Sequence, residues 1–321
     1  MYNQTEAILS QYEIEIHEVT KGRGSFICDT NIGKLLLVPF RGSREKGRLL
    51  YHFLAQLQAK NFDAEQICLT RNQEALSEDE YTGEHFILKT YIEGTEISTS
   101  KEEEMKEAVR MLAIYHNAAE KVDLEVAGQM QFEIVEVWQR HYRELNKVRN
   151  YIRNRKKKNE FEQLYMKNFE HYHKYAKESL LILEEEKEAT RKVFCHGDFN
   201  QHNILFANGE YRIVHFENFA YSWAMTDLAN FLRKMLEKNE WNKKIGLELI
   251  EEYHRYRQIS TDDYRQLYGL LLFPEKFWKV ANHYMNSRKT WMSGKDIDKL
   301  VKVIEQEEKR LNFMENLFAF L

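Results

Sequence analysis

Apolar and polar positions alternate in the first part of the chain. Between residues 11 and 40, apolar side chains such as Ile14 and Ile16 are separated by charged ones, and the segment 34–40 is mostly apolar. A period of two indicates half-buried strands, and the polar, glycine-containing segment 20–25 is expected to be a turn between two of them.

Further along the chain, apolar positions recur every three to four residues, which is the period of a helix. Helices are predicted for residues 43–60, 101–120 and 242–321, and two long charged helices for residues 132–190. One more strand is predicted at residues 85–92. A group of strands followed by many helices is typical of an α+β protein.

The segment 194–236 carries the strongest local signals. Two apolar runs, 204–206 and 211–214, flank the dipeptide Asn208-Gly209, which predicts a hairpin. Downstream, Thr226 and Asp227 are expected to begin a helix, since they suit its N-terminus by capping and by charge.

Catalytic chemistry is indicated by the tripeptide His-Gly-Asp that ends at Asp198, with Asn203 five residues later. Kinases use a carboxylate and a carboxamide at this spacing: the aspartate accepts the hydroxyl proton of the acceptor, and the asparagine holds a magnesium ion. A kinase-like site needs a metal-binding aspartate just after the second hairpin strand. His215 stands there instead, and Glu217, two residues further, is the alternative metal ligand.

These motifs carry a family resemblance. HGDFNQHN, the following hydrophobic-His-Phe-Glu and the Thr-Asp-Leu at residue 226 together resemble the aminoglycoside phosphotransferase-like kinases. FLRKMLEKNEW (231–241) and PEKFWKVANHYMNSRKTW (274–291) resemble the CotS family of spore coat proteins, and the similarity covers most of residues 10–315.

The resemblance implies an α+β, bilobal protein kinase-like fold. It implies a small N-lobe with an antiparallel sheet over residues 1–94, which is β-rich and nucleotide-binding-like, and a large helical C-lobe over residues 95–321. The C-lobe would contain the catalytic-like loop 196–203 and a helical insertion at about 121–190.

It also implies roles for single residues. His196 would hold backbone, Asp227 would brace the catalytic loop, and the region of Glu93 would be the hinge that receives an adenine ring. In an active member, ATP with Mg or Mn would be the cofactor.

The turn at 20–25 would cover the nucleotide phosphates with Gly22 and Gly24, flanked by Lys21 and Arg23. An ordinary hairpin turn with solvated basic residues is the alternative interpretation. Arg41, at the end of a later strand, is a further basic residue for which solvation is favoured.

The third strand normally carries the lysine that pairs with the α- and β-phosphates. Val38 stands in its place, and Lys34 lies about 13 Å back along the strand at ~3.3 Å per residue. Losing both this ammonium and the metal carboxylate should cost many orders of magnitude in rate, because about 1.36 kcal/mol is a factor of ten.

The main hypothesis is therefore a pseudokinase of the CotS type, with phosphotransfer lost or severely weakened and a structural role in coat assembly. The alternative is an active ATP-dependent phosphotransferase acting on a small-molecule or coat-protein hydroxyl. Nucleotide binding without transfer is intermediate. A zinc site built from His196, His202 and His215 is less favoured, because the kinase-like fold assigns the first two to a loop whose histidines normally hold backbone.

Composition and charge limit the cellular compartment and the classes of partner that we expect. The chain has 321 residues, a net charge of −4 and three cysteines without a Cys-x-x-Cys pair, which suits a reducing compartment. No nucleic-acid or membrane partner is implied, and the basic run at 147–158 is expected to be a solvated face, with an anionic partner as the second interpretation. We expect a protein that is cytoplasmic at synthesis and then assembled into the coat with spore coat proteins as partners; the oligomeric state stays open.

Overall fold

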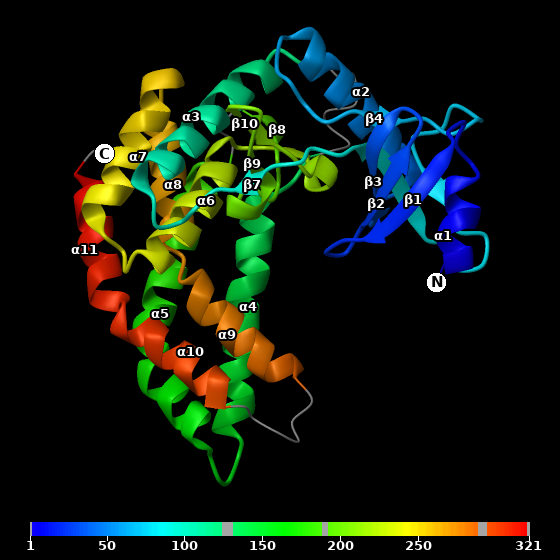
Figure 1. Cartoon of the computed structure of the whole chain (residues 1–321). Helices are drawn as coiled ribbons and strands as arrows, with labels where there is room; N and C mark the ends of the chain where they lie inside the picture. Colours follow the sequence, from blue (N-terminus) through cyan, green and yellow to red (C-terminus); the bar gives the residue numbers. More distant parts are fainter. Residues whose placement is uncertain (1, 124–130, 188–191, 288–293, 320–321) are drawn as a thin grey trace. The chain divides into compact units, whose positions relative to one another are not determined.

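The computed structural model describes residues 2–123, 131–187, 192–287 and 294–319 (Figure 1). Parts of the expected insertion, at 124–130 and 188–190, and the end of the segment 274–291 lie outside these ranges. The chain divides into two compact units. The first comprises Met1–Ser98, Met111–Gln131 and Phe194–Tyr221, and the second comprises Thr99–Arg110, Phe132–Val193 and Ser222–Leu321. The loop 196–203 thus belongs to the first unit, and a lobe boundary near residue 94 stays a prediction.

An antiparallel sheet forms the framework of the first unit, as the alternating pattern predicts. Its order is β1-β2-β3-β6-β4, and β5 also pairs with β6. The strands are β1 (Ile16–Lys21), β2 (Phe26–Thr30), β3 (Gly33–Phe40), β4 (Ile67–Cys68), β5 (Ser77–Glu78) and β6 (His85–Thr90).

One face of this sheet is covered by the N-terminal helix α1 (Tyr2–Leu9), which the sequence pattern did not reveal. Leu9 of α1 packs in one core cluster with Leu35, Leu37 and Leu88 of the sheet. Residues at even positions of β3 therefore face the other side of the sheet, because successive strand side chains alternate.

The predicted helix at 43–60 is confirmed as α2 (Arg44–Ala59). Ser43 caps it, because its hydroxyl accepts a hydrogen bond from the backbone N–H of Lys46 (3.1 Å). The apolar stripe of α2, which includes Phe53 and Leu57, is fully buried.

The predicted hairpin is confirmed as β9 (Ile204–Ala207) and β10 (Glu210–Ile213). A third strand, β7 (Thr95–Glu96), pairs with β9 on the side away from β10. Asn208 and Gly209 both have positive φ, 53° and 85°, as the two central residues of a type I′ turn require. The remaining short elements nearby are β8 (Val193–Cys195), β11 (Ala220–Ser222), η2 (Gln201–Asn203) and η3 (Phe216–Asn218).

Helices make up the second unit, as the period of 3.6 predicts. Helix α3 (Glu102–Ala119) begins in this unit and ends in the first. The others are α4 (Ile134–Arg153), α5 (Glu160–Glu185), α6 (Met225–Lys238), α7 (Lys243–Tyr256), α8 (Thr261–Leu272), α9 (Glu275–Asn286), α10 (Gly294–Glu305) and α11 (Glu307–Phe318).

Helix α5 contacts α4, α8 and α10 of this unit. A capping box fixes its start, in which Asn159 and Glu162 exchange hydrogen bonds between side chain and backbone. Aromatic rings of α5 then stack on Phe277 of α9, with ring centroids at 4.9 Å for Tyr165 and 4.1 Å for Tyr172. None of the described helices is both long and apolar enough to cross a bilayer.

The expected start of α6 is wrong in one respect. The helix begins at Met225 after Ala224, whose side chain cannot cap it, so neither Thr226 nor Asp227 is the capping residue. The Thr226 hydroxyl donates to the carbonyl of Trp223 (2.8 Å). Asp227 lies within the first turn, where its negative charge suits the helix dipole.

Candidate functional site

The loop before β9 brings Asp198 and Asn203 together. The Asn203 side-chain amide donates to the Asp198 carbonyl (2.9 Å) and approaches its carboxylate Oδ2 (3.5 Å). This arrangement leaves the Asn203 carbonyl oxygen, a hard ligand of the kind magnesium prefers, outside both contacts. The two motif residues therefore lie in contact, and their catalytic and metal-binding roles stay a prediction.

Backbone contacts hold this loop against the segment that follows β10. The His196 ring Nε2 lies 2.9 Å from the carbonyl of Val214, and its Nδ1 accepts the backbone N–H of Asp198 (3.2 Å). Gly197 has a φ of 80°, and a Cβ there would lie 2.0 Å from the Asn218 carbonyl oxygen. Only glycine fits this approach, which places the loop directly against the residue after Glu217.

Lys89 is the residue that sequence reasoning missed. It lies on β6, and its side chain is only 2% exposed. Its ammonium forms ion pairs with Glu65 (2.9 Å) and with Glu217, and it lies 3.3 Å from His215 Nδ1. Two carboxylates and an imidazole thus surround one buried ammonium.

Glu65 belongs to the connection between α2 and β4, and it also fixes the segment after β10. One of its carboxylate oxygens accepts the backbone N–H of His215 (3.0 Å) and the other that of Phe216 (3.1 Å). Below them, Phe216 packs on Phe53 and Tyr115, with ring centroids at 6.4 and 5.5 Å. The segment is therefore held by ion pairs, backbone hydrogen bonds and ring packing together.

Glu217 does not lie on an extended strand. His215 has a φ of 70° in the left-handed region, and residues Phe216–Asn218 form one turn of 3₁₀ helix. This turn, rather than strand alternation, directs both His215 and Glu217 toward Lys89, with His215 Nδ1 3.6 Å from the Glu217 carboxylate.

Charge pairing sets the protonation of this cluster. Burial alone would raise the pKa of Glu217, but the Lys89 ammonium and His215 outweigh it and hold that pKa below its usual value. Burial alone would lower the pKa of Lys89, and the two carboxylates instead raise it. Lys89 and Glu217 are therefore both charged at neutral pH.

Val38, predicted at the usual lysine position, lies on β3 opposite Ile87, while Leu36 lies opposite Lys89. Lys34 pairs with Glu93 (3.2 Å) of the expected hinge, and both side chains are at least half exposed. The Glu93 hydrogen bond raises the pKa of Lys34.

The turn between β1 and β2 contains the expected glycines. Gly24 has a φ of 72°, and the backbone N–H of Gly22 donates to the carbonyl of Ser25 (2.8 Å). Lys21 and Arg23 are exposed. A role for this turn in covering phosphates stays a prediction.

The three histidines of the zinc alternative have separate partners. Both ring nitrogens of His196 contact backbone, and Nδ1 of His202 lies 2.5 Å from Glu96, while His215 faces Lys89. The structure therefore lends the zinc alternative no support.

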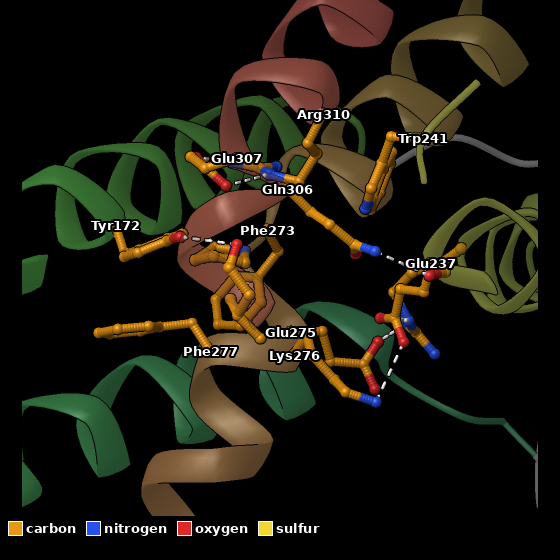
Figure 2. Close-up of a pocket in the computed structure, with 13 residues that line it drawn as sticks. Tyr172, Glu237, Trp241, Phe273, Glu275, Lys276, Phe277, Gln306, Glu307 and Arg310 are labelled. Carbon is orange, nitrogen blue, oxygen red and sulfur yellow. Dashed lines mark hydrogen bonds and ion pairs between the residues drawn. The ribbon is translucent and has the colours of Figure 1, made fainter. Parts of the chain in front are cut away.

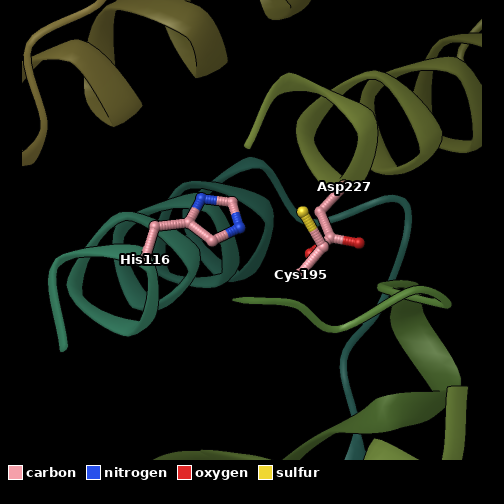
Figure 3. Close-up of side chains that lie close together, drawn as sticks. All are labelled: His116, Cys195 and Asp227. Carbon is pink, nitrogen blue, oxygen red and sulfur yellow. The ribbon is translucent and has the colours of Figure 1, made fainter. Parts of the chain in front are cut away.

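Figure 3 shows two further groups of the first unit, His116 on α3 and Cys195 on β8. His116 is fully buried, and Cys195 is 1% exposed. Asp227, drawn in the same figure, belongs to the second unit, where it is buried in the first turn of α6.

The second unit contains a small cavity of about 30 Å³, lined by charged and aromatic side chains (Figure 2). Its charges are paired internally: Arg233 with Glu275, and Arg310 with Glu307 at 2.8 Å. Because about one water fills 10–15 Å³ of such space, the cavity is too small for a nucleotide or a substrate.

A two-lobed phosphotransferase architecture is what the comparisons with solved structures support. An aminoglycoside phosphotransferase from Alicyclobacillus acidocaldarius matches with a TM-score of 0.82 and 19% identity, covering 98% of this chain and 95% of that chain. Spectinomycin phosphotransferase in complex with ADP and spectinomycin matches with a TM-score of 0.69 and 16% identity (99% and 97% covered). Amicoumacin kinase in complex with AMP-PNP and Ca²⁺ matches with 0.64 and 12% (96% and 92% covered). The chain therefore has the aminoglycoside phosphotransferase-like fold.

The family follows from the sequence itself. Residues 5–317 match the family described as "Spore coat putative kinase YutH", so the chain belongs to that CotS-like family of spore coat putative kinases. A search of the curated proteins finds no match.

Proposed function

We propose that this chain is a structural module of the spore coat, built on a kinase fold whose ATP phosphotransfer is lost or severely weakened. The state of Lys89 carries the proposal. A phosphate-binding lysine must present its ammonium to the nucleotide, whereas the Lys89 side chain is 2% exposed and neutralised by Glu65 and Glu217.

Metal binding is weakened by the same contacts. Glu217 lies two residues after His215, which stands at the usual metal position, and its carboxylate is engaged by Lys89 and His215. Histidine is a poor substitute, because magnesium prefers hard oxygen ligands. A metal supplies several kcal/mol of transition-state stabilisation, and each increment of about 1.36 kcal/mol is a factor of ten in rate.

The role in the coat rests on family membership. In this proposal the protein is made in the cytoplasm and is assembled into the spore coat through contacts with other coat proteins. The kinase fold then serves as a stable scaffold, and Lys89 supplies internally the positive charge that a metal supplies in an active kinase.

The test combines ATP turnover with thermal shift. Purified protein is incubated with ATP and Mg²⁺ or Mn²⁺, and released phosphate is compared with that of Asp198→Asn, which removes the only expected proton acceptor. We expect equal background release and no change in melting temperature. A shift that does not need metal would indicate nucleotide binding without transfer. Turnover that Asp198→Asn abolishes would refute the proposal.

The second candidate function is an active phosphotransferase acting on a small-molecule or coat-protein hydroxyl, with ATP and Mg or Mn as cofactors. The hydrogen bond from Asn203 to the Asp198 carbonyl favours it, because this bond orients the carboxamide oxygen as a metal ligand. This candidate requires Glu217 to leave Lys89 when the nucleotide and metal arrive, and metal-dependent turnover is its signature.

A further inference from the structure

The charge of the chain is distributed unevenly around α4 and α5. Residues 137–177 contain twelve Lys and Arg and four Glu, a net charge of +8. Since the whole chain carries −4, the remainder carries −12. We call residues 137–177 the basic hairpin. Its positive local field is not apparent from the negative net charge of the whole protein.

The basic side chains of α4 share one face. Arg140, Arg143 and Lys147 are all exposed and are spaced three and four residues apart, so they lie above one another on the helix. Glu136 precedes this row by one turn. The face therefore becomes basic from Arg140 toward the end of α4.

The connection between α4 and α5 extends this face. Arg153, Lys156 and Lys157 are exposed there. Figure 1 shows this connection at one end of the second unit, beyond α9 and α10.

Helix α5 adds Lys167, Lys174 and Lys177, which are also exposed. Across the described part of the hairpin, none of these lysines and none of the six basic residues named above forms an ion pair with another described residue. The paired arginines are Arg149, with Glu170 at 2.8 Å, and Arg155, with Glu162 at 3.1 Å.

We propose that the basic hairpin is a docking surface for an acidic segment of a partner protein. Charge complementarity favours an anionic partner. The residues outside the hairpin carry a net charge of −12 and repel a long polyanion that extends past it, so the partner segment is expected to be short. The 20 residues of α4 span about 30 Å, the length of roughly nine residues of extended peptide.

Two other classes of anionic partner fit less well. Single-stranded nucleic acid needs exposed rings on which bases stack, whereas the Phe, Tyr and Trp rings in the described part of the hairpin are buried or, at Tyr142, Tyr151 and Tyr175, only half-exposed. Membrane surfaces favour exposed apolar anchors, and among the described residues of the hairpin no large hydrophobic side chain is exposed. The proposal rests on the second unit alone and does not depend on whether ATP binds.

The experiment measures binding of a fluorescein-labelled peptide of alternating Glu and Ser by anisotropy, at several salt concentrations. The hairpin variant carries Lys147→Glu, Lys156→Glu and Lys157→Glu. The matched control carries Lys60→Glu and Lys243→Glu together with Lys302→Glu, three exposed lysines outside the hairpin, and so changes the net charge equally. We expect the hairpin variant to bind at least about tenfold more weakly and the control to change less than about twofold, with binding by the wild type weakening as salt rises.

Equal losses in both variants would overturn the proposal, because net charge and not the hairpin would then govern binding. Tighter binding to duplex DNA or to anionic phosphatidylglycerol vesicles than to the peptide would also overturn it. Sedimentation is the last check: a concentration-dependent increase in mass that only the hairpin variant abolishes would make a second copy of the chain the partner instead. Circular dichroism and melting curves establish that both variants are folded.

Discussion

Replacing Lys89 with methionine tests the central claim about the site. Methionine has nearly the same shape and removes only the ammonium, which leaves the carboxylates of Glu65 and Glu217, 3% and 15% exposed, without their cation. Breaking a buried ion pair by removing one partner costs about 3–5 kcal/mol. Since native proteins are stable by only about 5–15 kcal/mol, this is a large share of the total.

The assay is equilibrium unfolding in urea, followed by tryptophan fluorescence. The matched control is Lys34→Met, which removes a lysine from the neighbouring strand; its ion pair with Glu93 is exposed, so we expect no resolvable change. The triple variant Lys89→Met with Glu65→Gln and Glu217→Gln should be more stable than Lys89→Met alone, because no uncompensated charge remains. If Lys89→Met costs no more than Lys34→Met, or if the triple variant is less stable than the single one, the buried cluster does not hold the site as argued.

Three further predictions concern the same region. Gly197→Ala should destabilise the loop strongly, because its Cβ would lie 2.0 Å from the Asn218 carbonyl oxygen, and the melting temperature will report it. The pKa of Glu217 is lowered on folding, so its contribution to the free energy of unfolding is complete above the unfolded pKa of about 4.3 and is lost as pH falls toward its folded pKa; acid titration of the unfolding midpoint checks this. The double variant Val38→Lys with His215→Asp should gain a metal-dependent thermal shift with ATP, and no gain would contradict the assignment of these two positions. Aspartate tolerates the left-handed φ of 70° at residue 215 better than most residues.

Local patterns predicted most of the fold. The hairpin around Asn208 followed from two residues that accept positive φ, and α2 followed from its apolar stripe behind Ser43. The pairing of Asp198 with Asn203 followed from their spacing on one loop. Each of these features depends on residues close together in sequence, where backbone geometry limits the outcomes.

The rest of the site depends on contacts that no local pattern encodes. Lys89 meets residues 24 and 128 positions away, Glu65 and Glu217. Lys89 was visible as the single cation in the apolar strand HFILKTYI, and a buried lysine needs a partner. Glu65 gave no such signal, because it lies in an irregular connection and is buried only by the segment that follows β10.

The position of Lys89 also decides how the second candidate function could operate. Leu36 on β3 lies directly opposite Lys89 on β6, so Lys89 shares a sheet face with Val38, the predicted lysine position, and lies one strand over and two residues along from it. A nucleotide could reach the Lys89 ammonium only if its phosphate replaced the Glu217 carboxylate. The variant Glu217→Gln distinguishes the inactive coat module from the active phosphotransferase. It leaves one carboxylate, that of Glu65, to pair with the Lys89 ammonium, so it should destabilise the protein less than Lys89→Met does. We expect neither wild type nor Glu217→Gln to show a thermal shift with ATP and Mn²⁺. A shift in the wild type that Glu217→Gln abolishes would mean that Glu217 exchanges lysine for metal, and metal-dependent ATP turnover by the same protein would then show that it is a working phosphotransferase.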